Sequence, residues 1–176
     1  IPDGALLTFD SAPIIYFLED HPRYAEHFAP AFDAVDTGRI QAAVSAITLA
    51  EVLSGPLAAG NEILAARYSE VLTHAPGWQL VPVDAAIATQ AARLRVNYRL
   101  RLPDALQLAT AILTRSHALV TYDNAFARIK ADGVTTLIID IRANEGGNDD
   151  MWRDGLLPYL ATQRYSVGTG SPGHSA

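Results

Sequence analysis

The sequence predicts an α/β domain in which helices cover the faces of a mainly parallel sheet. Two observations support this fold class. Short apolar runs alternate along the chain with longer segments whose apolar residues have helical spacing. The 176 residues are 49% hydrophobic and 18% charged, so the chain can bury the core of one compact domain.

The strands are predicted from short apolar runs bounded by polar or turn-forming residues. The first run follows Gly4, and the third lies between Gly77 and Asp84. We expect strands at residues 5–9, 42–47, 78–83, 118–121 and 134–139.

The segments between these runs predict helices. The first should start with Ser11, a good N-cap residue, and end at His21-Pro22. A later helix should start at Thr48 and end near Gly55-Pro56. The remaining helices are expected at residues 23–37, 61–73 and 85–99, from Pro103 onward, and as a short turn at 124–130.

The composition excludes several classes of protein. Without cysteine the chain forms no disulfides and no thiolate metal sites, which suits the cytoplasm. The net charge of −6 argues against broad nucleic-acid binding through a basic surface, but it is compatible with a local basic strip or a basic protein partner. No apolar run reaches the ~20 residues that span a bilayer. The start lacks a basic region, so no signal peptide is expected, and because Ile1 is not an initiator we expect residues upstream.

The character of the chain changes after about Arg142. A polar linker is followed by a predicted short amphipathic helix at 151–161 and an end rich in Gly and Ser. We therefore expect a domain at residues 1–141 and a C-terminal extension at residues 142–176 that folds back loosely on it.

Acidic residues occur at four separated positions, each at or near a predicted helix start: Asp10, Glu51, Asp104 and Asp123. Three of them follow apolar, strand-like runs. In an open parallel sheet the carboxyl ends of the strands face one crevice. Carboxylates gathered there repel one another unless a divalent cation neutralises them. The pattern therefore predicts a metal-dependent enzyme.

Each acid also has a structural explanation when it is taken alone. Thr48 and Glu51 have the spacing of a capping box, and Asp104 with Gln107 fits the same logic. The other two acids precede predicted helices, where a carboxylate complements the helix dipole. For any single acid, capping is the stronger explanation, and only the joint pattern favours a shared site.

Other polar residues carry weaker signals. Four arginines gather just ahead of Asp104, and contacts to phosphate groups explain them as well as a solvated helix face with intramolecular ion pairs does: Arg93, Arg95, Arg99 and Arg101. The five histidines show no ligand spacing, so we expect none of them to be catalytic. Tyr16 and Phe17 are expected to pack in the core rather than to form a partner surface.

Four stretches extend the acidic pattern: LTFDSAPIIY at 7–16, SAITLAEVL at 45–53, LPDALQLATA at 102–111 and LVTYDNAF at 119–126. Through these stretches, over roughly residues 5–141, the chain resembles the PIN-domain ribonucleases, and most of all the VapC-type toxin of a VapBC toxin–antitoxin pair. The resemblance implies a doubly wound three-layer α/β/α sandwich. It also implies dependence on Mg²⁺ or Mn²⁺, endonucleolytic cleavage of RNA, a VapB-like antitoxin partner and a homodimer.

Residue by residue, the family's acidic positions fall on the same four residues, which are expected to be catalytic and to bind metal: Asp10, Glu51, Asp104 and Asp123. Ser11 and Thr121 fall on small polar positions, where they are expected to bond a carboxylate or a phosphate oxygen. With Arg99 and Arg101 they are the candidates for substrate binding. Two departures bear on the metal: Tyr122 stands where Asn is common, and Asn124-Ala125 stands where some members carry another acid.

The leading hypothesis is a metal-dependent endoribonuclease that acts as a toxin. A housekeeping PIN nuclease and a catalytically silent PIN-like RNA-binding or interaction module are the alternatives. In the leading hypothesis Asp10 and Asp104 are the best candidates for direct metal ligands. Glu51 either binds the metal or orients the attacking water, and Asp123 acts through water or a second ion.

Overall fold

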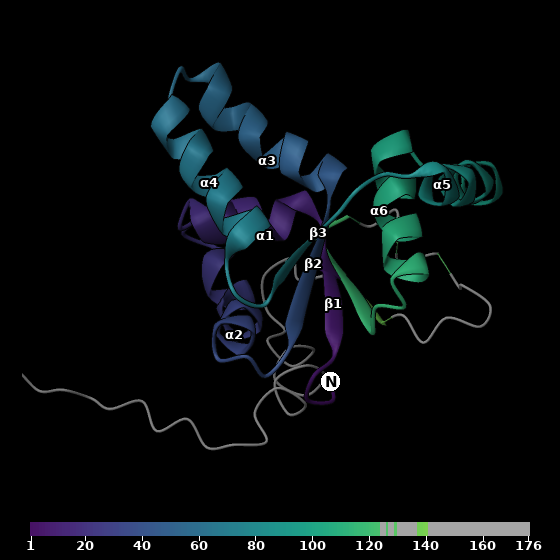
Figure 1. The fold of residues 1–176 in the computed structure, drawn as a ribbon, viewed down its shortest axis with the longest axis horizontal. Coiled ribbons are helices and arrows are strands. Elements are labelled where there is room, and N and C mark those ends of the chain that lie inside the picture. The colour runs from purple at the N-terminus through teal and green to yellow at the C-terminus, as the bar shows by residue number, and fades with distance from the viewer. Residues whose placement is uncertain (124–125, 127–128, 130–136, 141–176) are drawn as a thin grey trace, which may run out of the picture.

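The computed structural model describes residues 1–123, 126, 129 and 137–140. In this part of the chain a parallel sheet has the strand order β3-β2-β1-β4-β5. Its strands are β1 (Leu6–Phe9), β2 (Gln41–Ser45), β3 (Trp78–Val81), β4 (Ala118–Thr121) and β5 (Leu137–Asp140) (Figure 1). The predicted parallel sheet is therefore confirmed.

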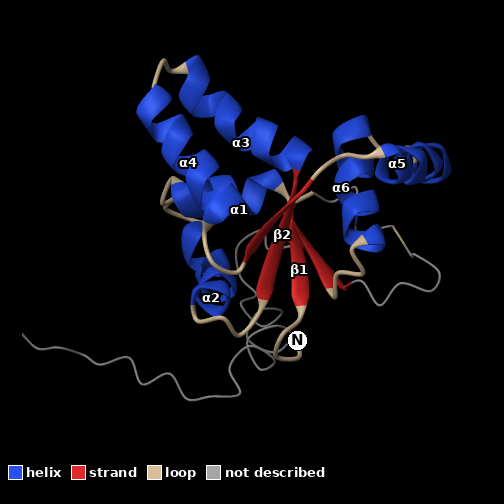
Figure 2. Ribbon diagram, in the orientation of Figure 1, coloured by secondary structure: helices blue, strands red, loops and turns tan. Residues whose placement is uncertain are grey.

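Helices cover both faces of the sheet, as Figure 2 shows. One face carries α1 (Ser11–Leu18), α2 (Ala25–Asp36), α3 (Ala46–Ala58) and α4 (Glu62–His74). The other carries α5 (Ala85–Tyr98) and α6 (Leu102–Leu113). This arrangement is the three-layer α/β/α sandwich that the resemblance implied.

Alternating side chains of the strands divide the core into two clusters. Leu7 and Phe9 face α1–α4. Leu6, the residue before Leu7, packs with α5 and α6 instead. Likewise Val120 belongs to the first cluster and Leu119 to the second. Both faces are thus apolar, as expected of parallel strands that are buried on two sides.

The strand order reverses beside β1. The chain runs outward from β1 to β2 and β3, then returns through α5 and α6 to place β4 on the other side of β1. In open α/β sheets, ligands bind at such a switch point, outside the carboxyl ends of the strands. The fold therefore directs attention to the residues that follow β1 and β4.

Several predicted boundaries were wrong. The second strand stops at Ser45 because that hydroxyl caps α3 by accepting a bond from the Ile47 backbone N–H at 3.3 Å. Helix α3 then continues through Gly55 and Pro56, and the chain turns at Gly60 with φ of +68°. The third strand ends at Val81 because Asp84 caps α5.

The aromatic side chains of α1 pack as the core hypothesis predicted. Phe17 stacks on Phe32 of α2 with ring centroids 4.0 Å apart, and Tyr16 packs against Tyr24 at 5.0 Å. Both α1 residues contact the larger core cluster. They join α1 to α2 beneath the carboxyl ends of the strands.

Some predictions fall outside the described residues. They are most of the helical turn at 124–130, the beginning of the strand predicted at 134–139, the helix at 151–161 and the domain boundary at residue 141. The division into residues 1–141 and 142–176 therefore stays a prediction. Within the described part of the chain, no helix is long and apolar enough to span a membrane.

Candidate active site

A cavity of about 190 Å³ lies at the carboxyl edge of the sheet, where the strand order reverses. The four predicted acids line it, although they come from four separate segments of the chain. Its lining residues are Asp10, Ser11, Ala12, Glu51, Arg101, Asp104, Tyr122 and Asp123. Of the predicted site residues, only Arg99 and Thr121 are missing from this lining.

Asp10 is fixed at the end of β1 by hydrogen bonds to both of its carboxylate oxygens. The Ser11 backbone N–H donates to Oδ1 at 2.6 Å, so Asp10 itself caps α1 and the predicted Ser11 cap was wrong. The Thr121 hydroxyl donates to Oδ2, also at 2.6 Å. With only 7% of its surface exposed, Asp10 forms the floor of the cavity.

Thr121 ties together the acids that follow the two central strands. Its fully buried hydroxyl donates to Asp10 and accepts from the Asp123 backbone N–H at 3.0 Å. Of the two roles predicted for Thr121, the bond to a carboxylate is present. Thr121 has no exposed surface, and its hydroxyl positions Asp10.

Glu51 lies inside α3 rather than at its start. The predicted capping box was wrong because Ser45 caps this helix, and the Thr48 hydroxyl instead donates to the Phe9 carbonyl at 3.4 Å. The Glu51 carboxylate is therefore free of a capping role and faces the cavity. The Gln107 side chain of α6 donates to its Oε2 at 3.0 Å.

Gln107 is a site residue that sequence reasoning missed. Its spacing from Asp104 suggested a helix cap, but the N-cap of α6 is Arg101, which makes no capping bond with its side chain. Gln107 is 1% exposed, and its Oε1 has no hydrogen-bond partner among the described residues. The same spacing that suggested a cap places Asp104 and Gln107 on one face of α6, which is the signal that was available.

Arg101 bridges the two remaining acids. Its Nε and Nη2 donate to the two oxygens of Asp104 at 2.8 and 3.1 Å, and Nη2 also donates to Asp123 at 3.0 Å. The Arg101 side chain is 75% exposed, whereas that of Asp104 is 10% exposed. An exposed cation therefore covers a nearly buried carboxylate at the mouth of the cavity.

The other arginines of the predicted cluster do not line the cavity. Arg93 and Arg95 lie exposed on α5, and Arg99 ends that helix in a left-handed conformation with φ of +56°. The hypothesis of a solvated helix face fits these three residues. Arg101 lines the cavity, and its bonds to Asp104 and Asp123 match the alternative of intramolecular ion pairs.

The cavity raises the pKa of two of its carboxyl groups. Burial raises the pKa of Asp10, and hydrogen bonds from Thr121, Ser11 and Gln107 offset part of this effect. Burial also raises the pKa of Glu51, as do the charges of Asp10 and Asp104, against a bond from Ser11 and the charge of Arg101. Two acids of the cavity therefore hold protons more strongly than exposed carboxyl groups do.

The family model for the PIN domain matches residues 7–132 of the chain, which contain all four acids. The chain belongs to the PIN domain family. The resemblance that the sequence predicted is therefore confirmed. A comparison with curated protein sequences returned no match.

Chains from toxin–antitoxin systems are among the solved structures to which this chain is similar. A chain of a toxin–antitoxin complex from Klebsiella pneumoniae is 27% identical, with a TM-score of 0.56, over 74% of this chain and 95% of that one. A chain of the VapBC2 complex from Rickettsia felis, bound to promoter DNA, is 16% identical, with a TM-score of 0.60, over 77% and 98%. VapC20 from Mycobacterium tuberculosis, described as a toxin that cleaves the sarcin–ricin loop, is 12% identical, with a TM-score of 0.57, over 69% and 92%.

The donor atoms of this PIN-domain cavity suit a hard divalent cation. Mg²⁺ and Mn²⁺ prefer oxygen ligands, and four carboxylates supply them here. As they stand, no three His, Asp or Glu side chains of the described residues could hold an ion together. In this arrangement the Arg101 guanidinium provides a positive charge beside Asp104 and Asp123.

Tyr122 marks the departure from the family's usual residue. It lines the cavity, and its ring lies 5.3 Å from that of Tyr16 and 4.9 Å from that of Tyr24. Burial and the neighbouring Tyr24 raise the pKa of Tyr122 to about 12, so its hydroxyl stays neutral. A neutral phenol here adds no negative charge to the four carboxylates.

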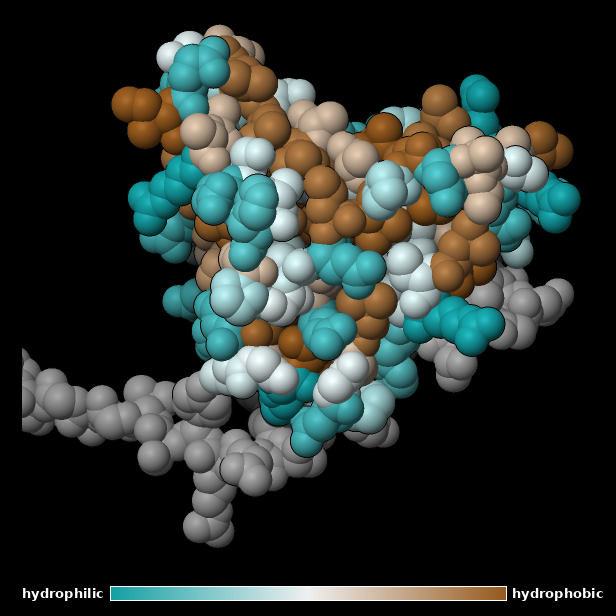
Figure 3. All heavy atoms as spheres, viewed as in Figure 1, coloured by the Kyte–Doolittle hydropathy of each residue, from teal (hydrophilic) through white to brown (hydrophobic). Residues whose placement is uncertain are grey.

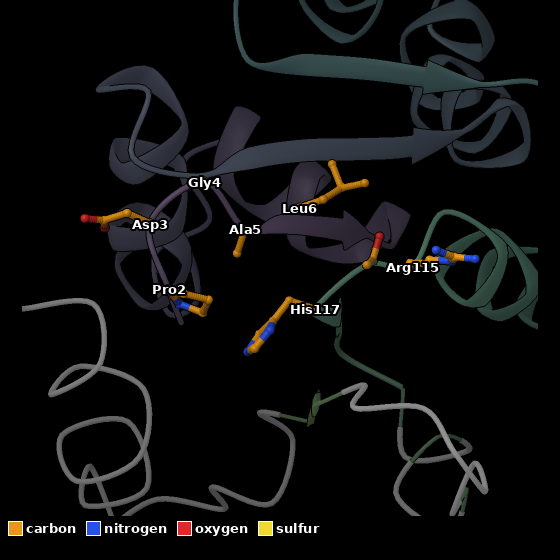
Figure 4. Close-up of a pocket in the computed structure, with 8 residues that line it drawn as sticks. Pro2, Asp3, Gly4, Ala5, Leu6, Arg115 and His117 are labelled. Atoms are coloured by element: carbon orange, nitrogen blue, oxygen red, sulfur yellow. The ribbon is translucent and has the colours of Figure 1, made fainter.

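A second cavity of about 330 Å³ lies at the other end of the strands, where β1 and β4 begin (Figure 4). It is formed by the segment that leads into β1 and by the turn before β4, which includes Arg115 and His117. Asp3 is the one acid among its lining residues. The amino ends of parallel strands are not where ligands of such sheets bind, so its larger volume does not make it the candidate active site.

Proposed function

We propose that the protein is a metal-dependent endoribonuclease and the toxin of a toxin–antitoxin pair. One observation carries the proposal: acids from four separate segments line one cavity at the switch point of a PIN fold. Charged carboxylates that lie close together repel one another unless a cation is near. A purely structural role does not explain why four of them share one cavity. The similar VapC20, described as cleaving the sarcin–ricin loop, supports RNA as the substrate class.

The proposed metal ligands are Asp10, Glu51, Asp104 and Asp123. When bound, Mg²⁺ or Mn²⁺ would lower the pKa of a water ligand and polarise a phosphoryl oxygen. Glu51 suits a second task, because a carboxylate with a raised pKa accepts a proton from an attacking water more readily. Asp10 is oriented by Thr121 and Ser11, so its oxygens need little reorganisation. The resemblance implies products with a 5′-phosphate and a 3′-hydroxyl.

Arg101 is the proposed phosphate contact. A guanidinium offers a planar pair of donors that matches phosphate oxygens, and this one lies at the mouth of the cavity with its side chain 75% exposed. Ser11 lines the same cavity and is the second candidate. Neither Arg99 nor Thr121 lines this cavity.

The experiment is cleavage of end-labelled RNA in the presence of Mn²⁺. We expect wild-type protein to cut the RNA and EDTA to stop it. Asp10→Asn should lower the rate by at least about 100-fold because it changes the charge of the cavity floor. Asp33→Asn, on the exposed side of α2, is the matched control. Undiminished cleavage by the folded Asp10→Asn variant would rule out the proposed mechanism.

The catalytically silent module is the second candidate, and the ion pairs of Arg101 favour it. If that guanidinium never leaves Asp104 and Asp123, the cavity holds no metal and the protein only binds RNA or another partner. Mn²⁺-dependent cleavage separates the two functions. Binding of RNA without cleavage at any Mn²⁺ concentration would favour the module.

An antitoxin partner and a homodimer belong to the same proposal. The similar chains from Klebsiella pneumoniae and Rickettsia felis come from toxin–antitoxin complexes. Figure 3 shows hydrophobic residues at the surface over α3 and over the pair α5 and α6, and Leu57 and Ile63 are exposed where α3 meets α4. We expect a dimeric mass in light scattering, and a monomeric mass for Ile63→Asp if this hairpin forms the contact.

A further inference from the structure

The ion pairs of Arg101 occupy the oxygens that a metal would need. Both oxygens of Asp104 accept bonds from the guanidinium, and Oδ2 of Asp123 accepts a third. A carboxylate that binds a cation directly gives up hydrogen bonds on the same lone pairs. Direct metal binding by Asp104 or Asp123 therefore competes with the present position of Arg101.

Arg101 is the partner that can move. Its side chain is 75% exposed, whereas the carboxylate of Asp104 is held in the first turn of α6 and is 10% exposed. The backbone at Arg101 is extended, with φ of −65° and ψ of 156°, and its side chain does not cap the helix. Among the described residues, release of the guanidinium into solvent thus breaks only its bonds to Asp104 and Asp123.

The released guanidinium stays close to the cavity. It is tethered one turn ahead of Asp104, at the mouth where a phosphodiester must approach the carboxylates. Arginine exchanges readily between carboxylate and phosphate partners because both match its planar fork. An RNA phosphate would therefore compensate Arg101 for the carboxylates that it gives up to the metal.

We propose that Arg101 is a built-in counter-cation that couples metal binding to RNA binding. In the metal-free protein its guanidinium pairs with both Asp104 and Asp123. When a divalent cation takes those carboxylates, the guanidinium moves to an RNA phosphate, so each ligand strengthens the binding of the other. The inference rests on the proposed function and adds how the same site is regulated.

The first test is Mn²⁺ affinity without RNA, measured from free Mn²⁺ by electron paramagnetic resonance. Arg101→Gln removes the competitor, and we expect it to bind Mn²⁺ roughly tenfold more tightly than wild type. Arg95→Gln, an exposed change in the last turn of α5, removes the same charge without touching a cavity carboxylate. Equal affinity in the two variants would overturn the inference, because general electrostatics would then explain the whole effect.

The second test is the coupling itself. A short single-stranded DNA oligonucleotide supplies phosphodiesters as the probe, and Mn²⁺ affinity is measured with and without it. We expect the oligonucleotide to tighten Mn²⁺ binding in wild type and in Arg95→Gln, and to have little effect in Arg101→Gln. Coupling of the same size in all three proteins would contradict the role of Arg101.

A third readout follows the guanidinium directly. The Nε–H resonance of Arg101, assigned by its loss in Arg101→Gln, should shift as Mg²⁺ is added because its bond to Asp104 breaks. A resonance that stays unchanged while Mg²⁺ binds would refute the exchange and leave the nuclease proposal standing. Failure of the wild-type protein and both variants to bind Mn²⁺ or Mg²⁺ would refute the nuclease proposal and this inference together.

Discussion

In the metal-free protein at neutral pH, the charged forms of Glu51 and Asp10 lower the free energy of unfolding. Burial raises the pKa of both carboxyl groups in the fold, so folding favours their protonated forms. For such a group the favourable contribution to folding is complete below the pKa of the unfolded chain. It is lost as pH rises through the raised pKa of the folded protein. The site therefore reduces stability at the pH where it is proposed to act.

Glu51→Gln should stabilise the metal-free protein at pH 7. The neutral amide removes the buried charge and still accepts from Gln107, and its own N–H₂ can donate to the Gln107 Oε1, which lacks a partner among the described residues. The gain should shrink as pH falls toward 4.5, the ordinary pKa of Glu, because wild type then becomes protonated too. Urea unfolding across this range measures it. Glu62→Gln, at an exposed residue of α4, is the control, and a constant gain for Glu51→Gln would contradict the account.

Gln107 should matter for the metal more than for the fold. Gln107→Leu removes the donor that holds Glu51, so we expect Mn²⁺ affinity to fall roughly ten- to a hundredfold, the loss of one hydrogen bond to a charged group. Thr110→Val, on the same buried helix but bonded only to the Leu106 carbonyl, should leave Mn²⁺ affinity unchanged. Equal effects of the two variants would show that packing of α6, rather than the position of Glu51, determines affinity.

At the scale of the elements, the turn residue Gly77, just before β3, lies close to Val35 of α2. Gly77 has φ of +82°, and a Cβ there would lie 3.0 Å from the Val35 Cγ1 and 3.2 Å from the Val35 carbonyl oxygen. Gly60 has φ of +68° but open space around its missing Cβ. A residue with a Cβ would therefore be strained at either position, but only at Gly77 would its Cβ also approach other atoms closely.

Gly77→Ala should lower the free energy of unfolding by roughly 2–4 kcal/mol, because strain and steric overlap act together. Gly60→Ala should cost only about 1 kcal/mol, from strain alone. Chemical denaturation of the two variants measures the difference. Equal costs would show that Val35 and β3 adjust freely to the added carbon.

The elements also show where sequence reasoning was limited. The caps predicted for α1 and α3 were wrong because several residues near each helix start could cap it. Tertiary contacts determine whether Ser45 or Thr48 caps α3, since the Thr48 hydroxyl donates to the Phe9 carbonyl of β1. The spacing of Arg101 and Asp104 suggests a local ion pair. The bond from Arg101 to Asp123, 22 residues away, depends on the sheet and could not be predicted.

For the whole molecule, alternation of strand and helix patterns was sufficient to predict a parallel sheet with covered faces. It did not determine the strand order, because the pattern is the same whichever side of β1 the fourth strand joins. The family resemblance supplied the doubly wound arrangement, and the order β3-β2-β1-β4-β5 explains why Asp10 and Asp123 meet. Convergence of Glu51 and Asp104 on the same cavity follows from helix packing, which the sequence does not encode locally.

The most direct measurement of the central claim is anomalous diffraction from a crystal soaked in Mn²⁺. The account predicts a Mn²⁺ peak within bonding distance of oxygens from Asp10, Asp104 or Glu51, with the Arg101 guanidinium withdrawn from Asp104. A crystal saturated with Mn²⁺ that shows no peak in the cavity, with Arg101 still bridging Asp104 and Asp123, would contradict it.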